Sequence, residues 1–200
     1  VIPIHGTNRP TLVNKPITRF IFVGQMIPRK GYDLYIQAAL HILATHSHVE
    51  FLSVGSGPLA SQSPTSSRFR TIDFRPNQEI RELMSDSTAL VLPSREDHWP
   101  LVVNEASSLG LFLVVSSKVG NRPEFCSPLN SYVLERLTVN CLIKAMNYVI
   151  NLSVHELMIA RTRSQQISTS FSDSTAASSL EAACIHFHKA HQGRSNGTLY

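Results

Sequence analysis

Residues 94–110 read SREDHWPLVVNEASSLG and directly follow the apolar run ALVLP at residues 89–93. The apolar run is β-prone and typical of a buried strand, and Pro100 stands where the first position of a helix tolerates proline. The stretch therefore predicts a strand, a polar corner and a helix in succession, which is the repeating unit of a parallel α/β sheet.

The polar corner carries two carboxylates, Asp97 and Glu105, with seven residues between them. If the helix begins near Pro100, Asp97 lies just before it and Glu105 in its second turn, so both can border one cleft. The free amide groups of a helix N-terminus attract anions such as phosphate, and carboxylates accept hydrogen bonds from hydroxyl groups. The corner is thus suited to a ligand that is phosphate in one part and polyhydroxylated in another, such as a nucleotide sugar.

On both sides of this corner, apolar runs and amphipathic segments alternate at short intervals. Such alternation implies right-handed crossovers between parallel strands. The fold class is therefore predicted as α/β, with a doubly wound, Rossmann-like parallel sheet and C-terminal helices. We expect strands at residues 19–24, 49–55, 68–74, 89–93, 111–117 and 131–134, and helices at 33–46, after Asn77 as a cap, from about Pro100, and at 139–152, 155–170 and 174–191.

The common strand order 3-2-1-4-5-6 predicts where a ligand binds. In this order, ligands lie at the carboxyl ends of the strands beside the point where the order reverses, between strands 1 and 4. The loop after the first strand, residues 25–31, carries Arg29 and Lys30, and the loop after the fourth carries Asp97. Cations for phosphate and carboxylates for hydroxyls are thus expected on opposite lips of one crevice.

Length and composition favour one domain. Two hundred residues with 42% hydrophobic content can bury a sizeable core. We expect a lead-in at residues 1–18, a domain at 19–191 and a loose tail at 192–200. No apolar run is long enough to span a bilayer, and no signal-peptide pattern opens the chain. Because the first residue is Val1 rather than Met, we expect the sequence to be part of a longer protein.

The charge pattern narrows the partners. The formal charge is +4, but only 16% of residues are charged and the Lys and Arg residues are scattered, which argues against nucleic acid. A mild preference for anionic ligands remains, compatible with peripheral association with a membrane surface. The three cysteines, Cys126, Cys141 and Cys184, are odd in number and widely spaced, which indicates free thiols and a cytoplasmic location.

Several other motifs are weaker signals. Gly55 and Gly57 in VGSGP lack the third glycine of a dinucleotide fingerprint and are read as a turn at the cleft edge. His98 is either a polar corner residue or a group near the sugar, and Trp99 either packs or stacks on a ligand. Another group, Cys184, His186, His188 and His191, would scatter over different helix faces, so no metal site is expected.

With these residues in place, the chain resembles the donor-binding C-terminal domain of retaining glycosyltransferases of the GT-B fold, the group 1 or sucrose synthase-like family. The acidic segment, with its two carboxylates separated by seven residues, is the most specific match. The matching segments, in order, are FVGQMIPRKGYDLYIQA, FLSVGSGPL, SREDHWPLVVNEASSLG and VVSSKVGNRPEF.

The resemblance implies a role for particular positions. Lys30 would contact the diphosphate and stabilise the leaving group, Asp97 would hold hydroxyls of the donor sugar, and Glu105 would bind the ribose. The backbone amides of Leu101 and Val102 would face the distal phosphate. The remaining donor-binding positions are Gly24, Gln25, Arg29, Gly55 and His98. The implied activity is transfer of a sugar from a nucleotide-diphosphate sugar with retention, on the cytosolic side of a membrane, without metal or cofactor.

The chain also departs from the family pattern. Gln25 stands where many relatives have a second phosphate-binding arginine, and Arg29 is the candidate to replace it. Asp97 replaces a commoner Glu, and Pro100 replaces a Gly. The acceptor-binding N-terminal domain of such enzymes lies outside the sequence. Two alternatives therefore stay open, a non-catalytic nucleotide-sugar-binding module and a sugar-nucleotide epimerase of the same fold.

Overall fold

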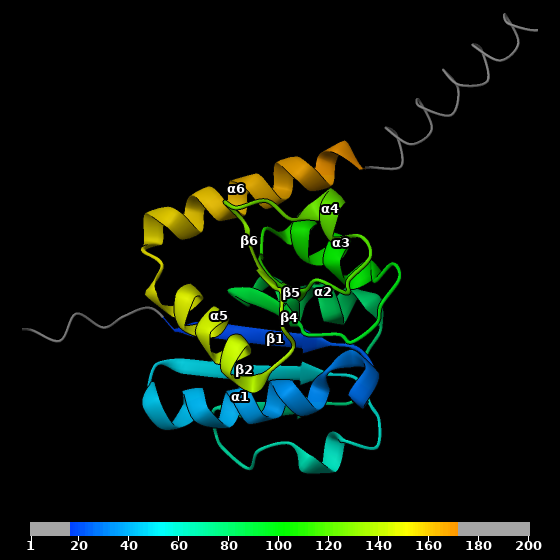
Figure 1. Ribbon diagram of the computed structural model, residues 1–200, viewed down its shortest axis with the longest axis vertical. Helices are drawn as coiled ribbons and strands as arrows, with labels where there is room; N and C mark the ends of the chain where they lie inside the picture. The colour runs from blue at the N-terminus through cyan, green and yellow to red at the C-terminus, as the bar shows by residue number, and fades with distance from the viewer. Residues whose placement is uncertain (1–16, 172–200) are drawn as a thin grey trace, which may run out of the picture.

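In the computed structural model, which describes residues 17–171, six parallel strands form one sheet in the order β3-β2-β1-β4-β5-β6 (Figure 1). This is the predicted doubly wound order, and the α/β fold class is confirmed. The strands are β1 Thr18–Val23, β2 Val49–Val54, β3 Phe69–Ile72, β4 Ala89–Leu92, β5 Phe112–Ser116 and β6 Ser131–Leu134.

Helices cover both faces of the sheet (Figure 1). α1 and α5 pack against each other, whereas α2 contacts α3 and α6 lies along α3. The two groups of helices lie on opposite faces of the sheet because the right-handed crossovers run outward from β1 in one direction and from β4 in the other. The helices are α1 Tyr32–Thr45, α2 Asn77–Ser85, α3 Leu101–Leu109, α4 Arg122–Phe125, α5 Val139–Asn151 and α6 Val154–Ser170, with short 3₁₀ turns η1 Pro28–Lys30 and η2 Ala60–Gln62.

The reversal of strand order falls between β1 and β4. Phe20 pairs with Ala89 and Ile21 with Leu90, so these two strands lie side by side in the same direction. Their carboxyl ends therefore adjoin, and the loops that leave them meet at one edge of the sheet. This is the edge at which the sequence predicts a ligand.

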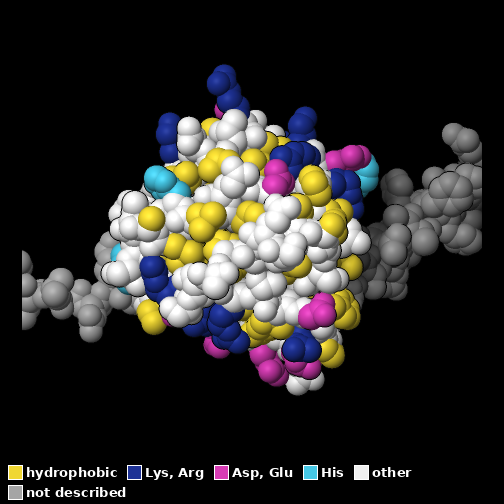
Figure 2. All heavy atoms as spheres, turned by 90° about the horizontal axis from the view of Figure 1, so that it is seen from below, with side chains coloured by type: hydrophobic (Ala, Val, Ile, Leu, Met, Phe, Trp, Pro, Cys, Tyr) yellow, Lys and Arg dark blue, Asp and Glu magenta, His cyan; other side chains and the backbone are white. Residues whose placement is uncertain are grey.

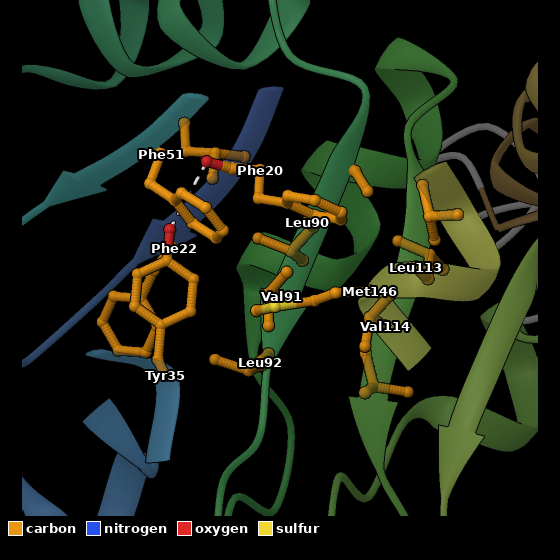
Figure 3. Packing of buried hydrophobic residues seen from close by; sticks show 14 of the residues in the cluster. Phe20, Phe22, Tyr35, Phe51, Leu90, Val91, Leu92, Leu113, Val114 and Met146 are labelled. Atoms are coloured by element: carbon orange, nitrogen blue, oxygen red, sulfur yellow. Dashed lines mark hydrogen bonds between the residues drawn. The ribbon is translucent and has the colours of Figure 1, made fainter. Parts of the chain in front are cut away.

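The core is apolar on both faces of the central strands, as buried parallel strands require. Phe20 and Phe22 of β1 pack with Tyr35 of α1 on one side, and Met146 of α5 lies among residues of β4 and β5 (Figure 3). The Tyr35 hydroxyl donates to the Leu52 carbonyl at 3.1 Å, and burial raises the pKa of Tyr35 well above its ordinary value. The central strands are thus held rigidly beneath the loops that follow them.

One local expectation was wrong. Asn77 does not cap α2, because Pro76 takes the N-cap position and Asn77 is the first helical residue. Helix α3 begins at Leu101 with Pro100 as its N-cap, which agrees with the expected start near Pro100. The other expected strands and helices within the described range lie within two residues of their expected bounds, whereas the short elements η1, η2 and α4 were not predicted. The helix expected at 174–191 and the domain limit at 191/192 lie outside the described range, and they stay predictions, as does the domain limit at 18/19.

The surface carries both signs of charge. On the face seen from below, Lys and Arg side chains alternate with Asp and Glu side chains around the rim (Figure 2). That face therefore lacks the single-sign patch of a nucleic-acid-binding surface.

Across residues 17–171, no helix combines the length and the apolar character that crossing a bilayer demands.

The approach of the β1–α1 loop to β4 gives a testable prediction. Gly31 has a φ of 71°, and a Cβ atom there would lie 2.0 Å from the Pro93 carbonyl oxygen. We expect Gly31→Ala to lower the free energy of unfolding by at least about 2 kcal/mol, because both the backbone conformation and the contact would be strained. Urea unfolding followed by circular dichroism measures this.

The matched control is Gln37→Ala, on the exposed side of α1. It should change the free energy of unfolding by no more than about 0.5 kcal/mol. Equal unfolding midpoints for Gly31→Ala and the control would contradict the close approach.

Candidate functional site

The loops after β1 and β4 are joined through backbone and side chains. The Arg95 amide donates to the Arg29 carbonyl at 2.8 Å. The Arg95 guanidinium donates to both carboxylate oxygens of Asp33, each at 2.7 Å, and also to the Pro28 carbonyl. The β4–α3 loop is therefore joined to the loop after β1 and to the start of α1.

This join brings Lys30 and Asp97 together. Lys30 comes from η1 at the end of β1, and its Nζ donates to Oδ2 of Asp97 in the loop after β4. The two side chains are only 16% and 9% exposed, and the Ser94 hydroxyl lies 3.5 Å from the same carboxylate oxygen. A cation and a carboxylate thus meet at the switch point, where the strand order placed them.

The loop between β5 and α4 supports Asp97 from behind. The Asp97 amide donates to the Lys118 carbonyl at 3.3 Å, and the Gly120 amide donates to the Asp97 carbonyl at 2.8 Å. Position 120 has no room for a side chain, because a Cβ atom would lie 1.9 Å from the His98 carbonyl oxygen. The Ser116 hydroxyl also donates to the Ser94 carbonyl at 2.5 Å. The backbone on both sides of Asp97 is therefore fixed.

Helix α3 begins directly after this corner. Pro100 is its N-cap and no side chain caps it, so the amides of Leu101 and Val102 have no acceptor within the helix. The side chains of Trp99 and Leu101 are largely exposed beside this helix end. The exposure of Trp99 argues against a packing role. Free amides at a helix N-terminus are chemically suited to an anion, and here they lie next to the Lys30–Asp97 pair.

Glu105 lies in the second turn of α3, as expected, but in different surroundings. It lines a cavity of about 520 Å³ between α2, α3 and the end of α6. Lys30 and Asp97 do not line this cavity. Within residues 17–171, only helix α3, which begins beside Asp97 and carries Glu105, links the two parts of the candidate site. Sequence reasoning missed the rest of the cavity, which consists of Arg81, Asn104, Ser108, Gln165, Ser168, Thr169 and Phe171.

The loop after β2 lies against the loop after β1. The Met26 amide donates to the Ser56 carbonyl at 2.8 Å, and a Cβ atom on Gly55 would lie 2.1 Å from the Gly24 carbonyl oxygen. The glycine turn is thus at the same edge of the sheet, where the sequence placed it. Gln25, between these contacts, is exposed.

The two remaining candidates, Arg29 and His98, both contact Glu96 in the β4–α3 loop. The Arg29 guanidinium donates to the Glu96 carbonyl at 3.2 Å. The His98 side chain is exposed, with its Nε2 atom 3.3 Å from a carboxylate oxygen of Glu96. Gln25 and Arg29 are the two candidates for the role of the second phosphate-binding arginine. The Arg29 side chain donates to a backbone carbonyl, whereas the Gln25 side chain is exposed.

No group of three or more His, Cys, Asp or Glu side chains within the described range is arranged to hold a metal ion. The cluster of Cys184 with three histidines lies outside that range. Cys126 and Cys141 are free thiols, and burial raises the pKa of Cys126 to about 11. The Cys126 thiol is therefore not poised as a nucleophile.

Residues 17–151 match the family model described as glycosyl transferases group 1. The chain belongs to this family. The match covers all six strands, the loops that hold Lys30 and Asp97, and helix α3 with Glu105, so the group 1 glycosyl transferase fold and the candidate site occupy the same part of the chain.

The similar curated proteins are glycosyltransferases. The phosphatidylinositol N-acetylglucosaminyltransferase GPI3 subunit of Saccharomyces cerevisiae is 25% identical over 157 residues, which cover 75% of this chain and 34% of that protein. An Escherichia coli UDP-Gal:alpha-D-GlcNAc-diphosphoundecaprenol alpha-1,3-galactosyltransferase is 25% identical over 154 residues, covering 73% of this chain and 40% of that protein. The chain thus spans about a third of the length of the GPI3 relatives it matches.

A solved structure shows the same fold. The crystal structure of WaaG, a glycosyltransferase involved in lipopolysaccharide biosynthesis, superimposes with a TM-score of 0.67 at 18% identity, covering 80% of this chain and 45% of that one. The chain therefore has the architecture of one part of a GT-B glycosyltransferase.

The ion pair between Arg95 and Asp33 joins the two loops, and it predicts that stability depends on pH. Hydrogen bonds from Arg95 hold the pKa of Asp33 below its ordinary value. The resulting stabilisation is present above about pH 4 and is lost as the pH falls through the lowered pKa. In Arg95→Gln we expect the pKa of Asp33 to rise, and the free energy of unfolding at neutral pH to drop by roughly 0.5 kcal/mol, because the pair is partly exposed. NMR titration and urea unfolding measure the two effects.

Arg75→Gln is the control, since Arg75 pairs with Glu79 on the surface and not with Asp33. The pKa of Asp33 should stay unchanged in this variant. A normal pKa for Asp33 in the wild type would rule out the ion pair with Arg95.

Proposed function

We propose that this chain is the donor-binding half of a glycosyltransferase that takes a sugar from a nucleotide-diphosphate sugar and transfers it with retention of configuration. The observation that carries the proposal is the contact between Lys30 and Asp97 beside the N-terminus of α3. A cation, a carboxylate and free helix amides are together suited to the junction between a sugar and a diphosphate.

Lys30 and Asp97 act at the bond that breaks. Asp97 accepts hydrogen bonds from hydroxyls of the donor sugar. Because the Lys30 ammonium has three donors, it can keep its contact with Asp97 and also bind a phosphate oxygen. When the bond between the anomeric carbon and the diphosphate oxygen breaks, negative charge develops on the leaving group, and Lys30 stabilises it.

The amides of Leu101 and Val102 bind the distal phosphate. They are fixed in direction by the helix, so they add to the stabilisation of the leaving group without reorganising. With Lys30 they supply the positive charge of the site, and in this proposal no metal ion or cofactor is required.

Glu105 holds the ribose. It lies four residues after Leu101, which is about 6 Å along a helix axis, so a diphosphate at the helix end places the nucleoside beside it. The cavity that Glu105 lines has the size of a small-molecule site.

The acceptor is bound outside this chain. Relatives are named for phosphatidylinositol and for a diphosphoundecaprenol-linked sugar, both lipids with phosphate groups. We therefore extend the proposal to an acceptor of this class, reached at the cytosolic surface of a membrane. The net charge of +4 favours such a surface.

The ribose role predicts the effect of Glu105→Ala. Removing charge-assisted hydrogen bonds worth about 1.5–3 kcal/mol should weaken binding of a nucleoside diphosphate at least tenfold. Calorimetric titration with a panel of nucleoside diphosphates measures the affinity. Glu79→Ala, on the surface of α2, is the control and should bind normally. An unchanged affinity in Glu105→Ala would remove the ribose role.

The leaving-group role predicts the effect of Lys30→Ala in the full-length enzyme. The transfer rate should fall on the order of a hundredfold, as for other removed charge stabilisers. Lys144→Ala, exposed on α5, is the matched control. Nucleotide binding without measurable transfer in the wild-type enzyme would favour the non-catalytic module, and a Lys30→Ala variant with normal rate would exclude the role.

A further inference from the structure

We propose that Asn121 is a positioning residue for the donor diphosphate. Its buried side-chain amide holds the first turn of α3, so that the amides of Leu101 and Val102 point at the distal phosphate. This inference rests on the proposed function, because the role is defined relative to that phosphate.

The contact that carries the inference joins two separate loops. Asn121 is 0% exposed, and its Nδ2 atom donates to the Pro100 carbonyl oxygen at 3.0 Å. The same oxygen accepts from the Val103 amide at 3.1 Å. The carbonyl group that starts α3 is therefore held from inside the helix and from the β5–α4 loop.

The side chain makes this bond instead of a local one. Asn121 is the N-cap residue of α4, where asparagine commonly accepts from a backbone amide, yet it makes no such bond. Its Oδ1 atom is buried without a hydrogen-bond partner. Buried amide groups are usually satisfied at both ends, and the bond to the Pro100 carbonyl is the one hydrogen bond that the Asn121 side chain makes within the described range.

Holding α3 through a carbonyl group has a chemical advantage. A Ser, Thr or Asp cap would accept hydrogen bonds from the amides of the first turn and so compete with a phosphate. Asn121 instead donates to Pro100, which fixes the helix end and leaves the amides of Leu101 and Val102 available. The neighbouring Gly120 binds the Asp97 carbonyl, so the same loop positions both the helix end and the carboxylate.

The experiment compares a nucleoside monophosphate with the diphosphate, because only the diphosphate carries the distal phosphate. The wild-type chain and its variants are titrated calorimetrically with the mono- and diphosphates of uridine and guanosine. The wild type should prefer the diphosphate. In Asn121→Ala we expect the affinity for the diphosphate to fall about fivefold and the affinity for the monophosphate to stay within twofold. Asn121→Ser, whose hydroxyl is too short to reach Pro100, is the second variant if the alanine variant does not fold.

Asn130→Ala is the matched control. Asn130 is also 0% exposed, and its Nδ2 atom donates to the Phe125 carbonyl at 3.0 Å, on the other side of α4. Its unfolding midpoint should drop while the preference for the diphosphate is kept.

The inference is overturned if the Asn121 variants keep the wild-type preference, or if Asn130→Ala loses it equally. Failure of the proposed function has a different signature: the wild type would show no preference for the diphosphate and Glu105→Ala would bind as the wild type does, and both proposals would then fall.

Discussion

The close approach of the β1–α1 loop to the end of β4 is the constraint on which the site depends. Gly31 lies against the Pro93 carbonyl, and the amide of Arg95 binds the carbonyl of Arg29. These are backbone contacts, which hold their geometry without help from charge. The Lys30–Asp97 pair is a consequence of them, because its side chains are largely buried and the cost of removing both charges from water offsets much of their attraction. The backbone contacts therefore position the ion pair, and the ion pair is not what holds the fold together.

Three loops contribute to the candidate site at this edge of the sheet. The loop after β1 supplies the cation Lys30, and the loop after β4 supplies Asp97 and the free amides of α3. The loop after β5 supports both through the carbonyl groups of Asp97 and Pro100. Because each loop follows a different buried strand, the parallel sheet fixes their relative positions and brings groups that lie far apart in the sequence to one edge.

The sequence predicted most of the fold and the centre of the site for a physical reason. Apolar runs identify buried parallel strands, and the strand order then places Lys30 and Asp97 at one reversal point. Contacts that depend on three-dimensional packing left no periodic signal. The Asn121 amide on Pro100 and the α6 residues around Glu105 belong to this class. Asn77 was predicted as a cap from its residue type, but the extended backbone of Pro76 took that position.

The helices that begin at the candidate site differ in their caps from the last two described helices. Thr138 caps α5, and Ser153 with Glu156 forms a capping box on α6. By contrast, α1 and α3, which follow the two strands at the reversal point, have no side-chain cap, and neither do α2 and α4. A missing capping side chain costs about 0.5–2 kcal/mol of stability, and only about a few tenths of a kcal/mol where the N-cap is a glycine, as in α1. Free amides at that edge are what an anionic ligand requires, because its oxygens replace the missing caps when it binds.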